Sequence, residues 1–123
     1  AEGRANGSSP AVQWHQLESE LAAGALLVDV RSEGEFARDT IPGATNIPVD
    51  NLRERFGELT GRRVIVHCQV GQRGHTATRL LRQLGIDASN LDGGFLTWKA
   101  GVGATATAVL EGSLTANPRR SRA

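Results

Sequence analysis

Short apolar runs that indicate buried strands alternate along the chain with segments of helical periodicity. Two of these runs, residues 25–30 and 64–67, are nearly continuous, which is typical of parallel strands covered on both faces. Weaker patterns predict an edge strand at residues 12–14, a brief strand within residues 38–48 and a last strand at residues 87–91. Strands separated by helices predict an α/β fold with a mainly parallel sheet.

The clearest helix follows the second apolar run. Four apolar positions recur there with helical spacing: Ala77, Leu80, Leu81 and Leu84. Gly85 stands where a helix commonly ends with a left-handed residue. We therefore predict a helix over residues 74–84.

Shorter signals predict four further helices. Leucines four positions apart indicate a helix at residues 15–23, and Ser32 is suited to cap a short helix with acidic residues in its first turn. Asp50 is expected to cap a helix that ends at Gly57, and the aromatic residues at 95–98 are expected to pack a final short helix.

The only cysteine of the chain, Cys68, stands at the end of the 64–67 run, a few residues before a helix. It therefore lies at the carboxyl end of a strand, where open α/β sheets bind their ligands. The intervening loop consists of Gln69, Val70, Gly71, Gln72, Arg73 and Gly74. If this loop curls around the sulfur, its free amides and the positive end of the helix dipole stabilise a thiolate or another anion.

The glycines of this region have predicted roles in the shape of the loop. Gly71 and Gly74 are expected to allow a positive φ where the amides turn inward, and Gly93 and Gly94 are expected to make a tight passage beside the loop. A free cysteine is most often a small buried hydrophobic residue. The sequence of strand, cysteine, glycine-bearing loop and helix favours a nucleophile at Cys68 instead.

Four pieces of the sequence resemble, in order and spacing, the rhodanese-like sulfurtransferases. They are residues 27–31 with Glu35 and Phe36, residues 41–48, the loop 68–73, and residues 91–95 with Trp98. The resemblance covers residues 12–100 and implies a single domain with a central, mainly parallel five-stranded sheet and helices on both faces. The loop looks most like that of rhodanese domains attached to flavin-dependent coenzyme A-disulfide reductases. Family members commonly have Gly-His where this chain has Asp39 and Thr40, so no histidine acts at this position.

The resemblance implies a sulfurtransferase without a cofactor. The thiolate of Cys68 would take a sulfane sulfur from a persulfide, a polysulfide or thiosulfate, hold it as a persulfide among the loop amides, and pass it to a thiol or to cyanide. The partners are then a small sulfur donor and a thiol acceptor, and the domain is expected either alone or as part of a larger redox protein.

Three charged residues are expected near the rim of this site: Asp29, Arg31 and Glu35. Arg31 either pairs with one of the two acids as a structural clasp or lends positive charge to the rim. Acids on both sides of it favour the clasp.

Two other functions compete with sulfur transfer. Cysteine-dependent phosphatases also cradle an anion in a cysteine loop, but they need five residues between the cysteine and the arginine, whereas Cys68 and Arg73 enclose four. A non-catalytic or regulatory module of a larger redox protein is the other alternative. The presence of Cys68 argues against loss of catalysis and leaves a regulatory role open.

The neutral residues Gln69 and Val70 bear on the choice of donor. Sulfurtransferases that favour thiosulfate commonly carry cationic side chains at these positions, and Glu35 adds a negative charge nearby. We therefore expect thiosulfate to be a poorer donor than a persulfide carried on an organic thiol such as glutathione or coenzyme A.

Composition limits the remaining choices. The 123 residues, 39% of them hydrophobic, are expected to form one domain at residues 11–100 between a flexible segment at 1–10 and a tail at 101–123. A net charge of +1 favours neither nucleic acid nor a membrane as a partner, and the dispersed histidines predict no metal site.

The location of the protein is predicted from its thiol and its hydrophobic pattern. The sequence has one cysteine and no apolar run long enough to span a bilayer, so we expect it in the reducing cytoplasm. It contains no methionine, from which we expect a processed chain or a domain of a longer protein.

Overall fold

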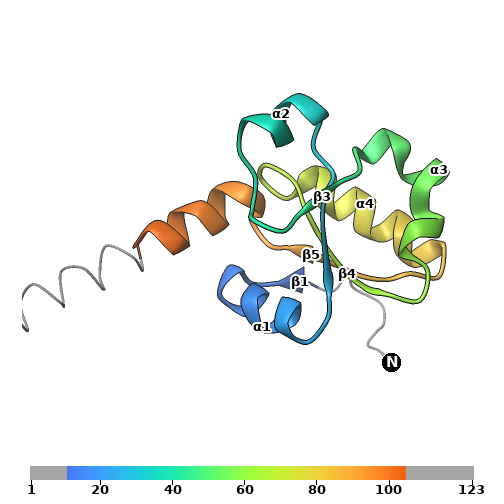
Figure 1. Cartoon of the computed structure of the whole chain (residues 1–123), viewed down its shortest axis with the longest axis horizontal. Coiled ribbons are helices and arrows are strands. Elements are labelled where there is room, and N and C mark those ends of the chain that lie inside the picture. The colour runs from blue at the N-terminus through green and yellow to red at the C-terminus, as the bar shows by residue number, and fades with distance from the viewer. Residues whose placement is uncertain (1–10, 105–123) are drawn as a thin grey trace, which may run out of the picture.

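The computed structural model describes residues 11–104 and contains one five-stranded sheet in which all pairs of neighbouring strands are parallel. The strands are β1 (Ala11–Val12), β2 (Leu26–Asp29), β3 (Thr45–Asn46), β4 (Arg63–His67) and β5 (Asp87–Leu91). Their order across the sheet is β1-β5-β4-β2-β3, with β4 in the centre. The predicted α/β class and parallel sheet are confirmed (Figure 1).

The helices are short, except for the one that follows the cysteine loop. They are α1 (Leu17–Ala22), α2 (Glu33–Arg38), α3 (Leu52–Arg55) and α4 (Gln72–Gln83), and residues 94–104 form a further helix. Three 3₁₀ turns complete the described elements, at Trp14–Gln16, Val49–Asn51 and Phe56–Leu59. Within residues 11–104, no helix has the length and hydropathy needed to span a bilayer.

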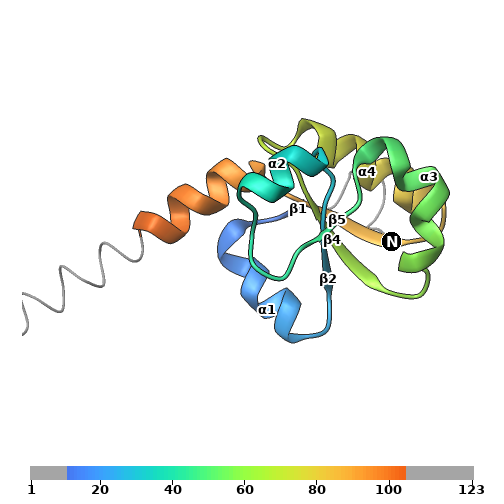
Figure 2. The same ribbon diagram turned by 45° about the horizontal axis from the view of Figure 1, so that its top comes forward.

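Alternate residues of the central strand pack on opposite faces of the sheet. Val64 and Val66 belong to a buried cluster with residues of α3 and α4, whereas Ile65 belongs to a second cluster with Leu17 of α1 and Phe95. Helices therefore cover both faces, with α3 and α4 on one side and α1 and the helix of residues 94–104 on the other (Figures 1 and 2).

The strand order brings the ends of β2 and β4 together. The two strands pair from Leu26 opposite Val64 to Asp29 opposite His67, and the amide of Val30 donates to the carbonyl of His67 at 2.9 Å. Residues that follow β2 therefore lie beside the loop that follows β4, at one edge of the sheet.

Several predicted boundaries differ from those observed. The first strand ends at Val12 because Trp14 begins a 3₁₀ turn, and α4 begins at Gln72, two residues before the prediction, because Gly71 already has a left-handed φ of 108°. Asp50 does not cap a continuous helix. It lies inside a 3₁₀ turn, and α3 follows without a side-chain cap.

The last helix continues into the segment predicted to be a tail. Residues 101–104 are helical, and Gly101 lies so close to the indole of Trp14 that a Cβ at this position would overlap the ring. The rest of the predicted tail, 105–123, and the predicted N-terminal segment, 1–10, lie outside the described residues.

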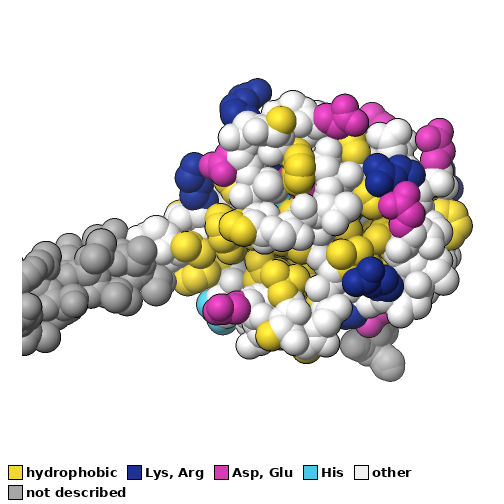
Figure 3. Space-filling model, in the orientation of Figure 1, with side chains coloured by type: hydrophobic (Ala, Val, Ile, Leu, Met, Phe, Trp, Pro, Cys, Tyr) yellow, Lys and Arg dark blue, Asp and Glu magenta, His cyan; other side chains and the backbone are white. Residues whose placement is uncertain are grey.

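An apolar groove of about 600 Å³ runs where this helix meets α1. Its hydrophobic lining includes Trp14, Leu21, Ile41, Trp98 and Val102. Figure 3 shows hydrophobic side chains gathered on this part of the surface. The groove lies against the face of the sheet that Ile65 contacts, on the opposite side from α4.

Candidate active site

Cys68 follows β4 directly, and its side chain is buried beneath the loop. Its Sγ accepts two backbone hydrogen bonds, from the amide of Gly71 at 3.0 Å and from the amide of Gly74 at 3.1 Å. Both amides belong to the beginning of α4, where the helix dipole is positive. Two donors and a helix end thus converge on one sulfur atom, an arrangement that stabilises negative charge on it.

A second helix binds two backbone carbonyls at the beginning of the loop. The amide of Phe95 donates to the carbonyl of Cys68 at 2.7 Å, and the amide of Leu96 donates to that of Gln69 at 3.1 Å. These donors belong to the first turn of the helix at residues 94–104, whose amides have no partners within the helix. Since a peptide group directs its N–H and C=O oppositely, binding these carbonyls on the outside favours a loop whose amides face inward.

Three glycines allow this arrangement for two different reasons. Gly71 has φ 108°, as predicted, and Gly94 has φ 66° and lies against the loop so closely that a Cβ there would come within 2.8 Å of the Gln69 carbonyl carbon. The tight passage predicted beside the loop is confirmed by these contacts. The expectation of a positive φ at Gly74 was wrong, because this residue is helical and is needed for space instead.

Arg73 is paired with Glu35. Its guanidinium donates to both carboxylate oxygens of Glu35, at 2.7 and 3.0 Å. These hydrogen bonds are the main reason why the pKa of Glu35 falls from 4.5 to about 2. Glu35 also closes the capping box of α2 with Ser32. The positive charge that Arg73 brings to the loop is therefore largely neutralised, and α2 is tied to the loop.

Arg31 pairs with Asp29, which is the clasp that the sequence favours. Both side chains are buried, and the guanidinium binds both carboxylate oxygens at 2.9 to 3.2 Å. Burial by itself raises the pKa of Asp29, but the hydrogen bonds from Arg31 and the other nearby donors hold it below its ordinary value. Arg31 also donates to Oε1 of Gln69 at 3.0 Å and stacks over the ring of Phe95. The clasp thus reaches the first residue of the loop.

Reasoning from the sequence missed two residues of this region. The hydroxyl of Thr40 donates to the carboxylate of Asp29 at 2.8 Å. Thr40 stands at one of the two positions where related sequences commonly have Gly-His. Asn90 of β5 donates from Nδ2 to the carbonyl of Gly71 at 3.3 Å. The one available signal for Asn90 was a polar amide within a strand whose neighbouring positions are buried.

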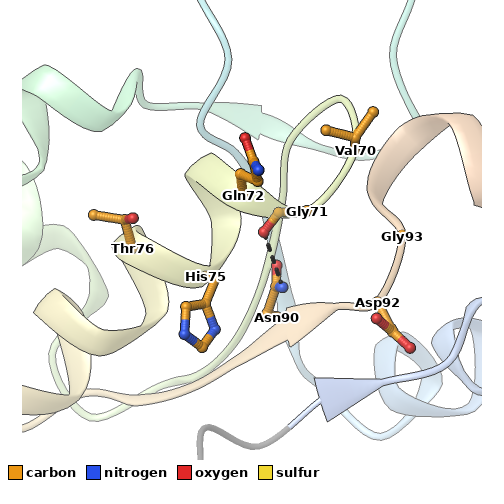
Figure 4. A pocket seen from close by; sticks show the side chains of 8 residues that line it. All are labelled: Val70, Gly71, Gln72, His75, Thr76, Asn90, Asp92 and Gly93. Carbon is orange, nitrogen blue, oxygen red and sulfur yellow. Dashed lines mark hydrogen bonds between the residues drawn. The ribbon is translucent and has the colours of Figure 1, made fainter.

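Two hollows flank the loop. One of about 480 Å³ (Figure 4) is lined by Val70, Gly71, Gln72, His75, Thr76, Asn90, Asp92 and Gly93. The other, of about 420 Å³, is lined by Arg31, Glu35, Arg38, Asp39, Gln69, Phe95, Leu96 and Lys99. Cys68 lines neither of them, and its sulfur lies between the loop and the end of the sheet.

Most of the charged side chains around the second hollow are paired, with Arg38 as the exception within residues 11–104. Lys99 pairs with Asp39 at 2.9 Å, in addition to the pairs of Arg31 with Asp29 and Arg73 with Glu35. Nowhere in residues 11–104 do three His, Cys, Asp or Glu side chains come together as metal ligands. The two amide hydrogen bonds to Sγ support the chemistry of a thiolate held by backbone amides.

Comparison with known proteins agrees with this architecture. The family model of the rhodanese-like domain matches residues 13–101. The chain is 38% identical over 107 residues to the human thiosulfate:glutathione sulfurtransferase, covering 73% of the chain and 93% of that protein.

Two further relatives are longer proteins. The chain is 38% identical over 86 residues to the HTH-type transcriptional regulator Rv0324 of Mycobacterium tuberculosis, covering 68% of the chain and 38% of the regulator. The solved structure of reduced Bacillus anthracis CoADR-RHD superposes with a TM-score of 0.70 at 37% identity, covering 73% of this chain and 16% of that one. The chain thus spans less than half the length of these two relatives.

Proposed function

The chain belongs to the family of rhodanese-like domains and is a sulfurtransferase, and we propose that Cys68 is the residue that carries the transferred sulfur. The observation that carries this proposal is the pair of amides, from Gly71 and Gly74, that donate to Sγ at 3.0 and 3.1 Å. Cys68 is also the only cysteine of the chain. Residues 69–74 form the substrate-binding loop in this proposal.

Transfer proceeds in two displacements. In the first, the Cys68 thiolate attacks the sulfane sulfur of the donor and a new S–S bond forms. The bond between that sulfur and the rest of the donor breaks, and its electron pair leaves with a thiolate or, for thiosulfate, with sulfite. In the second, an acceptor thiolate or cyanide attacks the outer sulfur, and the electron pair of the Cys68 S–S bond returns to Sγ.

The loop amides stabilise the negative charge that sulfur carries in both displacements. Negative charge resides on Sγ before the first displacement and after the second, and the persulfide is anionic between them. Because the amides are fixed by the fold, they stabilise this charge without reorganising during the reaction. No electrons are gained or lost overall, so the reaction requires no redox cofactor.

The substrates follow from the same family. A rhodanese-like sulfurtransferase needs a sulfane-sulfur donor and an acceptor, and we propose a small organic thiol in the acceptor role, as the name of the human relative pairs thiosulfate with glutathione. We also propose a reducing, cytoplasmic location, where a reactive thiol stays reduced. Fusion to a larger redox protein is a further proposal, supported by the match to part of CoADR-RHD.

Mass spectrometry of the intact protein tests the role of Cys68. We expect the wild type to gain the mass of one sulfur atom after incubation with a sulfane donor and to lose it on addition of a thiol. The variant Cys68→Ser, which replaces sulfur by the smaller oxygen, should gain no mass. Sulfur bound and released equally by this variant would contradict the proposal.

A further inference from the structure

We propose that Asn90 is a positioning residue for sulfur transfer, because its side chain holds in place both residues whose amides bind Cys68 Sγ. The proposal rests on the function proposed for Cys68. It concerns a residue that lies in β5, under α4, and that does not belong to the loop itself. Asn90 pairs in the sheet with Val66, two residues before Cys68, and therefore lies beneath the loop.

Asn90 fixes the peptide of Gly71 through a hydrogen bond. Its Nδ2 donates to the Gly71 carbonyl at 3.3 Å (Figure 4). The backbone amide of Gly71 in turn donates to Cys68 Sγ at 3.0 Å. The amide of His75 donates to this carbonyl as well, at 2.8 Å. Gly71 has no Cβ and hence wide backbone freedom, which its φ of 108° uses. The side chain of Asn90 therefore restrains the residue of the loop that has the most freedom to turn its amide away from sulfur.

Asn90 fixes Gly74 through packing. A Cβ at Gly74 would overlap Oδ1 of Asn90 and come within 3.3 Å of its Cγ. The carboxamide thus fills the space next to Gly74, whose amide donates to Sγ at 3.1 Å. One side chain contacts both sulfur-binding residues, through a hydrogen bond to the first and close packing against the second.

The burial of the Asn90 carboxamide carries a cost. Its side chain is 8% exposed, and its Oδ1 has no hydrogen-bond partner within residues 11–104. A buried polar atom without a partner costs stability, and an apolar side chain at this position of the strand would avoid the cost. The contact that only an amide supplies here is the hydrogen bond to Gly71.

Replacement of Asn90 should therefore make the Cys68 thiolate less stable and leave the fold intact. We expect Asn90→Leu, which has a similar size and no donor, and Asn90→Ser, which is too short to reach Gly71, to lower kcat/KM for sulfur transfer about tenfold. The rate of Cys68 alkylation by iodoacetamide should rise at a higher pH than in the wild type, because the sulfur loses a well-placed donor.

Ser89→Ala is the matched control. Ser89 is also a buried polar residue of β5, but it accepts a hydrogen bond from Arg63 at 2.8 Å, away from the loop. We expect this variant to lose stability and to keep the wild-type dependence of alkylation on pH. A purely structural role of Asn90 would give the same behaviour as Ser89→Ala.

The alkylation profile separates the two proposals. It reports on the thiolate of Cys68 whether or not sulfur is transferred, whereas failure of the wild type to form a persulfide would contradict only the proposed function. An unchanged profile in a folded Asn90→Leu or Asn90→Ser protein would overturn the positioning role. If Asn90→Leu does not fold, Asn90→Ser decides the question, since serine is smaller than asparagine and creates no new overlap.

Discussion

The residue that precedes Cys68 is a buried histidine whose ring nitrogens have no hydrogen-bond partner within residues 11–104. The ring of His67 is fully buried, neither nitrogen has a partner within residues 11–104, and Nε2 lies 3.6 Å from Oδ2 of Asp29. Burial lowers the pKa of His67 from 6.5 to about 4, although the charge of Asp29 acts in the opposite sense. His67 is therefore neutral at physiological pH and serves packing, with its ring 6.5 Å from that of Phe95.

This neutral histidine predicts an acid-sensitive stability. The free energy of unfolding should fall as the pH is lowered from 6.5 towards 4, because the unfolded chain binds a proton at His67 that the native protein excludes. The loss amounts to at most about 3 kcal/mol. We expect His67→Phe to flatten the dependence in this window, as measured by denaturant unfolding at several pH values. His75→Gln, at an exposed histidine, is the control. Equal slopes for wild type and His67→Phe would contradict this account.

At the scale of elements, two helices give the loop its shape. The beginning of α4 supplies the amides that bind sulfur, and the beginning of the helix at residues 94–104 binds the loop carbonyls. The free amides at the beginning of the helix at residues 94–104 thus stabilise the loop conformation in which the free amides at the beginning of α4 bind sulfur. The pair of Arg73 with Glu35 connects α2 to the same loop.

From the contact of the helix at residues 94–104 with the loop, we predict that Gly94 does not tolerate a side chain. We expect Gly94→Ala to destabilise the protein by about 1–3 kcal/mol, because φ 66° disfavours a side chain and a Cβ would press on the loop carbonyl groups. Alkylation of Cys68 should slow as the loop shifts. Thermal unfolding and alkylation rates measure the two effects.

Gly103→Ala is the control for this prediction. Gly103 lies in the same helix, and a Cβ there would meet no atom within 4 Å. The control should be neutral or slightly stabilising, since alanine favours a helix. Equal behaviour of Gly94→Ala and Gly103→Ala would show that the contact with the loop is unimportant.

At the scale of the whole molecule, the charges around the loop nearly cancel. Three cations near the site, Arg31, Arg73 and Lys99, are each paired with a carboxylate, whereas Arg38 lines the second hollow without such a pair within residues 11–104. The net charge of the sequence is +1. Neither the rim nor the molecule as a whole thus provides a strong field that would attract a small dianion.

This balance predicts a preference among donors. We expect kcat/KM for glutathione persulfide to exceed that for thiosulfate by about tenfold or more, because a dianion finds few free cations at the rim. Val70→Lys adds a cation at the rim, and Glu35→Gln leaves the cation of Arg73 without its partner. Both variants should therefore shift the ratio towards thiosulfate. Steady-state kinetics with the two donors measure it. A wild-type ratio below one would contradict the prediction.

Much of the fold and the outline of the site could be predicted because their signals are local. Residues 87–91 form β5 as predicted, and the position of Cys68 between a strand and a helix locates the loop. The 3₁₀ turns around α3 could not be predicted, because one apolar spacing suits both a continuous helix and these turns. Gly74 was assigned a backbone role, since a sequence does not show which side chain lies beside a glycine.

The pairings within the site were harder to predict because they join distant parts of the chain. Glu35 and Arg73 are separated by 38 positions, and several basic and acidic residues of the sequence could have formed such a pair. The contact of Asn90 with Gly71 depends on the register of β5 against β4 and on the position of α4 above both strands. Only the assembled sheet brings these residues together.

A single-turnover experiment tests the central claim, that a persulfide on Cys68 carries the sulfur, most directly. The protein is loaded with isotopically labelled sulfane sulfur, freed of donor and mixed rapidly with a thiol acceptor. We predict that the protein persulfide disappears at the rate at which labelled acceptor persulfide appears, in equal amounts, and at least as fast as steady-state turnover. Turnover that is faster than this decay, or that continues in Cys68→Ser, would contradict the account.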